Sequence, residues 1–452
     1  MSERADVIVV GMGVGGEAVA GSLAEAGLDV IGIEDRLVGG ECPYWGCIPS
    51  KMIVRAADLL AEAARVDGMA GQAQVWPDWK PVAARIRDEA TTNWDDRIAA
   101  DRFTGKGGRL VRGRGRLIAP DRVDVDGTTY EAGRAVVVGT GTSPAIPPID
   151  GLAGTPYWTN REALEATEAP ESLIVLGGGA VGLELAQGFA RFGTKVVVVE
   201  AQDRLIAIEE PEASDVARRA LQADGIDVRV GRRAQAVRHD GSAFTLRLDD
   251  EIEVSAQALL VSVGRTSNLS NLGVDAIGVD PSARSLPVDD RLRVVDGVWA
   301  VGDVTGHGAF THVATYQADI VVREILGRPG PPADYRAVPR VTFTDPEVGA
   351  VGMTEAQARE AGLAVRVGVA EVPSTTRGWI HKAGNDGMIK LVADAERGVL
   401  VGATSAGPTG GEVLGALAVA VHGQVPVEAL QHMIYAYPTF HRGILDAVKA
   451  LS

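Results

Sequence analysis

Only two cysteines occur in the 452 residues of the chain, Cys42 and Cys47, and they lie five positions apart. Two thiols this close in the sequence can form and break a disulfide during a reaction. A structural disulfide is the alternative, but closing so short a loop removes little entropy from the unfolded chain. A metal site would need about four tetrahedral ligands, and no histidine or further cysteine lies nearby. We therefore predict a redox-active pair.

A glycine-rich turn lies near the start of the chain. The apolar run at residues 6–10 is typical of a buried strand. It leads into Gly11, Gly13 and Gly16 in a Gly-x-Gly-x-x-Gly pattern, followed by a helical stretch at about 17–26. The first glycine permits a tight turn, the second lets a pyrophosphate approach the backbone, and the third lets helix and strand pack closely. The N-terminus of the helix would offer its free N–H groups and positive dipole to the phosphates.

The same unit occurs a second time. Its parts are, in order, a strand at 172–176, the glycines Gly177, Gly179 and Gly182, a helix at about 183–192, a strand at 195–199, and Glu200. In the first copy a strand at 29–33 precedes Glu34, and the step from first glycine to acid is 23 residues in both copies (34 − 11 and 200 − 177). Each acid is placed to accept hydrogen bonds from a ribose. Two such folds predict two dinucleotides, most simply a tightly held FAD and an exchanging nicotinamide nucleotide.

The cysteines lie beside the first of these folds, within Gly-Gly-Glu-Cys-Pro-Tyr-Trp-Gly-Cys-Ile-Pro-Ser-Lys at residues 39–51. A Gly-Gly-x-Cys-x4-Cys-x-Pro-Ser-Lys motif in this place resembles the pyridine nucleotide-disulfide oxidoreductases, the family of dihydrolipoamide dehydrogenase, glutathione reductase and mercuric reductase. The resemblance runs almost from end to end, with further motifs at residues 140–144, 263–268, 298–303 and 338–347.

The resemblance implies an α/β chain with two Rossmann-like dinucleotide-binding domains, for FAD and NAD, and a C-terminal α/β dimerisation domain. The expected division is a first FAD-binding segment at 1–150, an NAD-binding domain at 151–266, a second FAD-binding segment at 267–334 and a dimerisation domain at 335–452. Turn residues at 327–332 mark the last linker. Further expected elements are helices near 50–66 and 80–101, a β-rich piece at 108–125, and strands near 338–343, 364–371, 387–394 and 398–404.

The resemblance also assigns cofactor-binding residues outside the glycine turns. Gly141 lies in a segment that resembles the exit from the first FAD portion. Gly264 and Arg265 lie in one that resembles the return from the NAD-binding domain. Asp303 takes the place of the residue that binds the ribityl chain of FAD. The expected cofactors are therefore FAD and NAD.

A relay of electrons follows from the same resemblance. Nicotinamide hydride passes to the flavin, and the reduced flavin passes its electron pair to the disulfide. Cys47 would be the sulfur next to the flavin, and Cys42 the one that attacks an outside acceptor. Both are expected at the start of a helix, whose dipole should lower a thiol pKa. Lys51 and Glu184 match the family's ion pair near flavin N5, although taken alone they would be an exposed lysine and a first-turn glutamate.

Glu200 also predicts the choice of nicotinamide nucleotide. Its carboxylate can bond both ribose hydroxyls of NAD, whereas the 2′-phosphate of NADP would face a like charge. The next residues, 201–204, offer one cation, Arg204. We therefore expect NADH to be preferred over NADPH, with Arg204 as the residue that can favour the phosphate.

The C-terminal segment departs from the family. Members that act on dithiols carry a His-Pro-Thr segment followed by a glutamate, and this pair reaches across the dimer to move protons on the substrate sulfur. Here Tyr437 stands in the place of the histidine and Arg442 in that of the glutamate. A phenol with a pKa of about 10 is a poor base at neutral pH, and arginine does not act as one. His441 is the fallback base, with a structural histidine as the alternative.

We predict an enzyme, an FAD-dependent NADH oxidoreductase that passes electrons through the Cys42–Cys47 disulfide to a quinone, dye, metal ion or small disulfide. Tyr44 and Trp45 between the sulfurs, and Glu41 before them, would shape the approach of this acceptor. Three alternatives stay open. They are a dihydrolipoamide dehydrogenase with another base, a soluble transhydrogenase, which typically lacks the cysteine pair, and a flavoprotein sensor that binds NADH and signals without turnover.

Composition narrows the partners. The formal net charge of −16 would repel nucleic-acid phosphates and an anionic membrane surface. The apolar start carries charged residues and the glycine turn, so it is predicted to be a core strand and not a secretion signal. No uninterrupted apolar run reaches the ~18 residues of a membrane span. We expect a small-molecule acceptor and a homodimer, no nucleic acid or membrane, and a cytoplasmic location, where reducing conditions suit a cycling disulfide.

Overall fold

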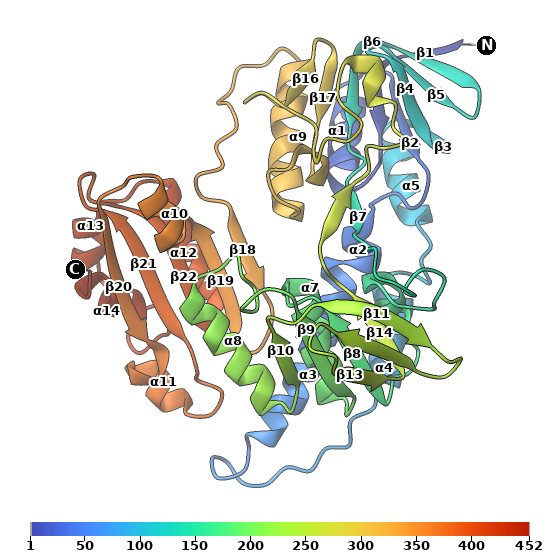
Figure 1. The fold of residues 1–452 in the computed structure, drawn as a ribbon. Coiled ribbons are helices and arrows are strands. Elements are labelled where there is room, and N and C mark those ends of the chain that lie inside the picture. The colour runs from blue at the N-terminus through green and yellow to red at the C-terminus, as the bar shows by residue number, and fades with distance from the viewer. Residues whose placement is uncertain (1, 452) are drawn as a thin grey trace. The chain divides into compact units, whose positions relative to one another are not determined.

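The chain forms two compact units, each assembled from three stretches of sequence. The computed structural model describes residues 2–451. The first unit comprises residues up to 49, 84–145 and 265–335, and the second comprises 50–83, 146–264 and 336 onward. Figure 1 follows the chain through both units by colour. The division into two FAD-binding segments, an NAD-binding domain and a dimerisation domain stays a prediction.

The first unit is built around one large sheet. The strands of that sheet are β1 (Ser2–Val10), β2 (Val30–Glu34), β3 (Arg109–Arg112), β4 (Gly115–Ala119), β5 (Arg122–Val125), β6 (Thr128–Val138), β16 (Arg293–Val295) and β17 (Val298–Ala300). Strands β7 (Thr142–Pro144) and β15 (Arg265–Ser267) pair with each other in a separate two-stranded sheet. The helices and helical turns of the unit are α1 (Val14–Glu25), α2 (Glu41–Trp45), the π-helix η1 (Ile86–Ala90), α5 (Arg97–Gly105), the 3-10 turns η2 (Val274–Ile277) and η3 (Asp303–Thr305), and α9 (Thr311–Ile325). Two more helices, α3 (Cys47–Ala64) and α4 (Lys80–Arg85), contain positions at which the two units divide.

The large sheet is mostly parallel, with β1 near its centre. The strand order is β16-β17-β6-β1-β2-β3, and β5 joins β4 to β6 in an antiparallel extension. Ile8 and Val10 of β1 belong to the core on the β4–β5 side, whereas Val7 and Val9 belong to the core under α1, α5 and α9. Figure 1 shows α1 and α9 side by side. The strand predicted at 6–10 is confirmed, and its burial on both faces is typical of a parallel strand.

The second unit contains three sheets. Its strands are β8 (Ser172–Leu176), β9 (Lys195–Glu200), β10 (Asp227–Val230), β11 (Ala234–His239), β12 (Phe244–Leu248), β13 (Glu253–Ala256), β14 (Ala258–Val261), β18 (Pro339–Thr342), β19 (Glu347–Gly352), β20 (Val365–Glu371), β21 (Met388–Asp394) and β22 (Val399–Gly407). Its helices are α6 (Asn160–Glu165), α7 (Ala180–Arg191), α8 (Pro211–Ala223), α10 (Glu355–Glu360), the 3-10 turn η4 (Val372–Ser374), α11 (Thr376–His381), α12 (Gly410–His422), α13 (Val427–His432) and α14 (Gly443–Lys449).

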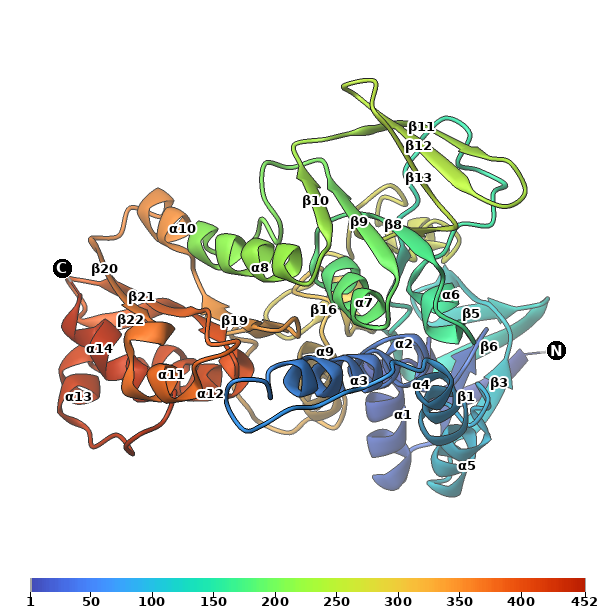
Figure 2. The same cartoon turned by 90° about the horizontal axis from the view of Figure 1, so that it is seen from below.

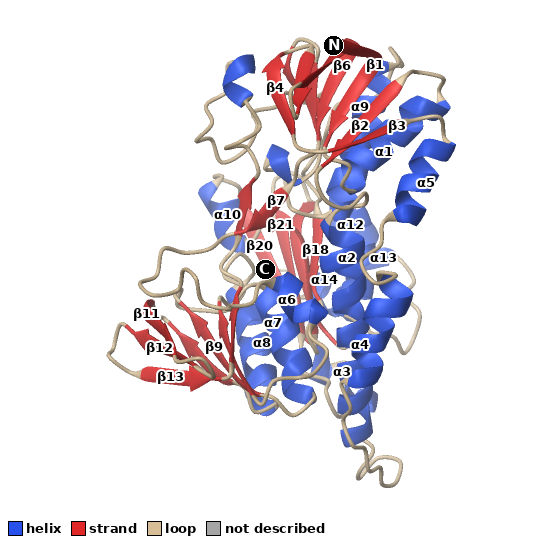
Figure 3. Cartoon of the chain, turned by 90° about the vertical axis from the view of Figure 1, so that its right-hand side faces the viewer, coloured by secondary structure: helices blue, strands red, loops and turns tan. Residues whose placement is uncertain are grey.

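These sheets differ in the direction of their strands. The order β10-β9-β8-β14 is parallel throughout, while β11-β12-β13 and β18-β19-β22-β21-β20 are antiparallel. Figure 3 shows β11, β12 and β13 as a separate small sheet. Helix α8 contacts both β10 and β22, and Figure 2 shows it between the two larger sheets. Among residues 2–451, no helix combines the length and apolar character that crossing a membrane would require.

One prediction about secondary structure is wrong, and one strand was not predicted. The helical stretch predicted at 80–101 is interrupted, because residues 92–94 adopt left-handed φ angles of 49°, 57° and 55° and α5 begins only at Arg97. The run Thr-Thr-Asn at 91–93 contains weak helix formers, and asparagine tolerates the left-handed region. Strand β19 was not predicted, because its Glu-Val-Gly-Ala-Val-Gly sequence reads locally as a turn. Pairing with β18 and β22 makes it a strand.

Lys390 on β21 is a buried cation. Its Nζ lies 2.9 Å from Glu210 Oε2, 2.8 Å from Glu212 Oε1 and 3.0 Å from Glu355 Oε2. The side chains of Lys390 and Glu210 are each only 3% exposed. Because Glu210 and Glu212 lie at the start of α8, this cluster fastens α8 to the C-terminal sheet.

Replacing Lys390 should therefore destabilise the protein strongly. Lys390→Met leaves the buried carboxylate of Glu210 without its cation, and removing one partner of a buried ion pair costs about 3–5 kcal/mol. Arg359→Met is the matched control, because Arg359 also pairs with Glu355 but its side chain is 57% exposed. An exposed pair contributes about 0–1 kcal/mol. Urea unfolding at pH 7 measures both, and equal losses of unfolding free energy would contradict this account.

Candidate active site

The first glycine turn has a backbone that only glycine fits at two positions. Gly11 has a φ of +91°, and a Cβ there would lie 2.6 Å from the carbonyl oxygen of Gly139. A Cβ at Gly16 would lie 1.9 Å from the carbonyl oxygen of Gly11. Gly13 differs, because a Cβ there would meet only the oxygen of Gly139 at 3.9 Å. No side chain caps the N-terminus of α1 at Gly13, so its first N–H groups remain available to a phosphate.

The second glycine turn repeats this pattern in the other unit. Gly177 has a φ of +110°, and a Cβ there would lie 2.4 Å from the carbonyl oxygen of Ser262. A Cβ at Gly182 would lie 2.5 Å from the carbonyl oxygen of Gly177. Gly179 precedes α7 and has no side-chain cap, and a Cβ there would have nothing within 4 Å. In each turn, the first and third glycines are therefore required by the backbone of the turn itself. The middle glycine leaves space through which a phosphate could approach the backbone.

Each turn is closed by the acid that ends its second strand. Glu34 accepts hydrogen bonds from the backbone N–H groups of Met12, at 2.7 Å, and Arg36, at 2.9 Å. Glu200 accepts from the two equivalent backbone positions, at 2.6 and 2.7 Å. Burial raises the pKa of Glu34. Each carboxylate oxygen keeps lone-pair capacity for a ribose hydroxyl, so the two turns fit FAD and a pyridine nucleotide.

Asp303 lies in a small polar cluster of the first unit. Thr142 Oγ1 donates to Asp303 Oδ2 at 2.7 Å, and Arg265 Nε donates to Thr142 Oγ1 at 2.6 Å. Arg265 Nε is also 3.9 Å from Asp303 Oδ2. Gly141 and Gly264 have φ angles of +62° and +126° in the two connecting segments. The structure thus brings Asp303 and Arg265 together, while their cofactor contacts stay a prediction.

The two thiols do not share a helix. Cys42 lies in α2, which has five residues, and Cys47 begins α3. Gly46 separates them with φ −134° and ψ −118°, which is not helical. The structure has both as reduced thiols, with no disulfide between them. A hydrogen bond with the Cys47 side chain, followed by burial, raises the pKa of Cys42, so the expectation that a helix start lowers it is wrong for Cys42.

Thr311 is a residue of this site that sequence reasoning missed. Its Oγ1 lies 3.5 Å from Cys47 Sγ, across 264 positions of sequence. Its hydrogen bond to the Cys42 side chain opposes the rise in that thiol's pKa. Thr311 is the first residue of α9. No local motif marks it, because only the packing of α9 beside α1 brings it to the sulfurs.

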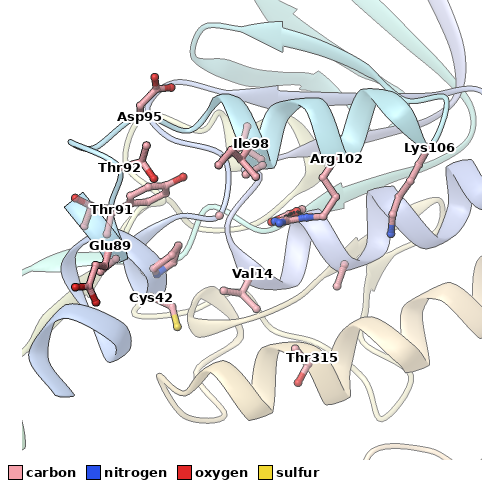
Figure 4. A pocket seen from close by; sticks show the side chains of 18 residues that line it. Val14, Cys42, Glu89, Thr91, Thr92, Asp95, Ile98, Arg102, Lys106 and Thr315 are labelled. Carbon is pink, nitrogen blue, oxygen red and sulfur yellow. Dashed lines mark hydrogen bonds and ion pairs between the residues drawn. The ribbon is translucent and has the colours of Figure 1, made fainter. Parts of the chain in front are cut away.

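Cys42 opens onto a pocket of about 570 Å³ within the first unit. The pocket is lined by α1, α2, α5 and the turn at 89–95, with Val14, Glu17, Ala18, Val38, Gly39, Cys42, Pro43, Tyr44, Glu89, Ala90, Thr91, Thr92, Asp95, Ile98, Ala99, Arg102, Lys106 and Thr315. Figure 4 shows Cys42 at one end of this pocket and Lys106 at the other. Arg102 Nε donates to Glu17 Oε1 at 2.8 Å, so this guanidinium is already neutralised. A small acceptor that enters the pocket would meet Cys42.

Lys51 and Glu184 meet in the second unit. Lys51 Nζ lies 2.6 Å from Glu184 Oε2. Glu184 is 6% exposed, and its Oε1 accepts from the backbone N–H of Phe343 at 2.8 Å. Lys51 Nζ also lies 4.5 Å from the centre of the Phe343 ring. The predicted pair therefore exists, and its role toward the flavin stays a prediction.

Of the C-terminal residues, Tyr437 lies at the surface of the second unit, whereas His441 and Arg442 are half-buried. Tyr437 is 65% exposed, and its hydroxyl donates to Thr376 Oγ1 at 3.4 Å. The guanidinium carbon of Arg442 lies 5.4 Å from the centre of the Tyr437 ring. The ring of His441 lies 6.3 Å from that of Tyr435. The two candidate replacements for the acid–base pair thus have different neighbours.

Gly13 and Gly179, where a Cβ would have space, allow the two predicted nucleotide sites to be tested separately. Gly13→Ala should fold, because its φ of −65° suits alanine and the methyl has space. The methyl would nevertheless obstruct the pyrophosphate, and an extra methyl in a close contact costs about 1–3 kcal/mol, or about 5–150-fold in affinity. We expect Gly13→Ala to lose FAD, measured by absorbance, and Gly179→Ala to keep FAD but raise the KM for NADH. Gly105→Ala, which also has space at its methyl position, is the control and should change neither.

Comparison with known proteins places this site in a family. Residues 5–318 match the family model described as pyridine nucleotide-disulphide oxidoreductase, and residues 338–448 match that family's dimerisation domain. The chain is 32% identical to a dihydrolipoyl dehydrogenase of Haloferax volcanii, covering 98% of this chain and 95% of that protein. It is also 32% identical to a mercuric reductase of Streptomyces lividans, covering 99% and 96%.

Solved structures agree with this assignment. LpdA of Mycobacterium tuberculosis gives a TM-score of 0.86 at 26% identity and covers 99% of both chains. RclA of Escherichia coli, a HOCl-induced flavoprotein disulfide reductase, gives a TM-score of 0.86 at 26% identity and covers 98% of this chain and 99% of its own. The chain therefore belongs to the pyridine nucleotide-disulphide oxidoreductase family, an enzyme family that binds FAD and a pyridine nucleotide.

Proposed function

We propose that the protein is an FAD-dependent NADH oxidoreductase that passes electrons through the Cys42–Cys47 pair to a quinone, a dye or a metal ion. The observation that carries this proposal is a substitution near the C-terminus. Tyr437 and Arg442 stand where members of the family that act on dithiols carry a histidine and a glutamate. Cys42 opens onto a pocket that a small acceptor could enter.

The chemistry of such an acceptor suits these residues. FAD, when bound, takes a hydride from NADH and delivers the electron pair to a disulfide. Cys42 and Cys47 then hold two electrons and two protons as thiols. Transfer to a quinone forms a hydroquinone and restores the disulfide, so both protons travel with the electrons. No separate base has to deprotonate the substrate, which is the step that a histidine performs in dithiol oxidation.

Two relatives support a metal ion as an acceptor. One is the mercuric reductase of Streptomyces lividans. The other is RclA of Escherichia coli, which has been solved as a Cu(II) complex at 25% identity. Among the described residues, no group of three or more histidine, cysteine or acidic side chains is arranged to hold a metal ion. A metal acceptor would therefore react at Cys42 as a transient substrate.

Dihydrolipoyl dehydrogenase is the second candidate. The observation that favours it is the 32% identity to such an enzyme of Haloferax volcanii over 98% of this chain. This function would require another base, and His441 is the histidine nearest to Tyr437 in the sequence. We rank this candidate second because Tyr437 and Arg442 replace the histidine and glutamate that dithiol oxidation uses.

A homodimer is the proposed assembly. The match of residues 338–448 to a dimerisation domain supports it. Large apolar side chains in the same region are also exposed, with Val419 at 68%, Met433 at 47% and Ile434 at 96%. Exposed apolar side chains at such density are typical of a surface that another chain covers.

NADH is the proposed electron donor. The carboxylate of Glu200 would repel a 2′-phosphate, and the cation able to oppose it has other partners. Arg204 Nη2 donates to the carbonyl oxygens of Ala207, at 2.6 Å, and Glu209, at 3.4 Å. Arg204 is thus turned toward its own loop, which leaves the charge of Glu200 to decide the preference.

We expect kcat/KM to favour NADH over NADPH by about tenfold or more, equivalent to about 1.4 kcal/mol of transition-state binding. Glu200→Gln should reduce this ratio, because it removes the charge and keeps a hydrogen-bonding group. Asp215→Asn is the control, since it removes a carboxylate of α8 that is 57% exposed and pairs with Arg218, and it should leave the ratio unchanged. Equal use of both nucleotides by the unmodified protein would refute the preference.

The acceptor preference has its own test. With NADH as donor, the protein should reduce a quinone well and turn over lipoamide substrates poorly, because general acid–base catalysis contributes about 10²–10⁴-fold. Tyr437→His combined with Arg442→Glu should raise dihydrolipoamide oxidation more than either change alone. Steady-state rates with a panel of acceptors measure this.

Cys42→Ser is the control for the route of the electrons. It should still be reduced by NADH but lose turnover with acceptors that react at the sulfur. If the unmodified protein oxidises dihydrolipoamide as fast as it reduces its best quinone, the second candidate replaces the first. If it turns over no acceptor at all, it is not the proposed enzyme.

A further inference from the structure

Helix α7 buries a polar face. Glu184, Gln187 and Arg191 follow one another at intervals of three and four residues, which places their side chains on one side of the helix. Glu184 and Gln187 are 6% and 4% exposed, and the side chain of Arg191 is 5% exposed. Buried polar groups are destabilising unless they are hydrogen-bonded or paired. Each of these three side chains therefore depends on its partners.

The partners on one side come from the segment at 343–345. Glu184 Oε1 accepts from the backbone N–H of Phe343 at 2.8 Å. Gln187 uses both ends of its amide on the backbone of Asp345, accepting from the N–H at 2.7 Å and donating to the carbonyl oxygen at 2.9 Å. The backbone of segment 343–345 is thus hydrogen-bonded to side chains of α7 at both Phe343 and Asp345.

The carboxylate of Asp345 is held by two guanidinium groups. Arg191 Nη2 donates to Asp345 Oδ2 at 2.7 Å, and Arg65 Nη2 donates to the same oxygen at 2.6 Å. Arg191 also reaches Asp224, through Nε at 3.0 Å. Asp224 lies beyond the end of α8, and its Oδ2 also accepts from Gln187 Nε2 at 2.8 Å. Asp224 therefore binds the same two side chains of α7 that hold Asp345.

The same face of α7 binds α3. Glu184 Oε2 lies 2.6 Å from Lys51 Nζ, and Arg191 Nη1 lies 2.9 Å from Asp58 Oδ1. Lys51 and Asp58 are seven residues apart, which is two helical turns, so they share a face of α3. Between them the helices approach closely, because a Cβ at Gly188 would lie 2.6 Å from an α3 side chain.

We infer that Asp345 is a positioning residue for the Lys51–Glu184 ion pair. Gln187 and Arg191 hold Asp345, and Asp345 in turn fixes Phe343 two residues before it. The backbone of Phe343 holds one oxygen of Glu184, while its ring lies under the ammonium of Lys51. Lys51 therefore keeps its place through a chain of contacts that ends at the Asp345 carboxylate.

This inference deepens the proposed function and rests on it only for the half-reaction with NADH. Lys51 and Glu184 match the family's pair near flavin N5, so their geometry bears on hydride transfer. Residues 343–345 belong to the region that matches the dimerisation domain. The contacts of Asp345 therefore join that region to the reductive half of the site.

The first test measures Lys51 directly in the flavin-loaded protein. Acetic anhydride acetylates amines, and mass spectrometry gives the rate at each lysine. Asp345→Asn should raise the acetylation rate of Lys51 by about fivefold or more, relative to exposed Lys195 in the same sample, because neighbouring groups couple at this scale. Asp215→Asn is the control. It removes a carboxylate of α8 that is 57% exposed and pairs with Arg218, outside the contacts of Asp345, and it should leave Lys51 unchanged.

The second test measures reduction of the flavin by NADH in an anaerobic stopped-flow instrument. Asp345→Asn should slow this step by roughly tenfold, since misplacement of a reacting group by about 1 Å costs up to about 10²-fold. In a Lys51→Met background the same change should have almost no further effect, because the residue through which it acts is gone. Additive losses in this double-mutant cycle would overturn the inference.

Other outcomes are equally decisive. Unchanged acetylation in Asp345→Asn, or an equal rise in Asp215→Asn, would overturn the positioning role. If Asp345→Asn fails to fold, Arg65→Met removes just one of the two guanidinium groups from Asp345 and should shift Lys51 in the same direction. No shift in that variant would overturn the inference. A preference for dihydrolipoamide would refute the proposed acceptor but leave these measurements intact, because they concern NADH and Lys51 alone.

Discussion

The second unit depends on one constraint: a charged side chain that is buried away from water must find an opposite charge within the protein. Glu184, Arg191 and Lys390 are each almost fully buried, and each finds its opposite charge on a different stretch of the chain. A buried ion that loses its partner is strongly destabilising, whereas the intact pair adds little net stability. These pairs therefore contribute little to the free energy of unfolding but favour one arrangement of the stretches 50–83, 146–264 and 336 onward. One of the pairs includes Lys51, so this arrangement also sets the position of Lys51.

The parts of the fold that the sequence predicts are those that depend on neighbouring residues. The two glycine turns, their strands and the acids Glu34 and Glu200 follow from short patterns, because a tight turn and an alternating strand are local requirements. Strand β19 and the break at 92–94 were missed, because sheet partners and packing decide them. Within the site, Cys42 and Cys47 were evident from spacing. Thr311 was not, because its meeting with the sulfurs is made by tertiary structure.

The chain follows its family in the half of the reaction that involves the nucleotides and differs from it in the half that involves the acceptor. The nucleotide-binding parts follow the family closely, and the Lys51–Glu184 pair is present. The acceptor side differs, because Tyr437 and Arg442 stand where members of the family that act on dithiols carry a histidine and a glutamate. A hydrogen bond with the Cys47 side chain, followed by burial, raises the pKa of Cys42 and so favours its protonated thiol over the thiolate.

The matching hydrogen bonds of Glu34 and Glu200 have a consequence for selectivity. Both carboxylates receive N–H groups from the same two backbone positions, at distances that differ by 0.2 Å or less. The adenosine diphosphate half is common to FAD and NAD, so it would meet nearly the same set of donors in either predicted site. That half would then not distinguish FAD from NAD. The distinction would have to come from the halves that carry the isoalloxazine and the nicotinamide.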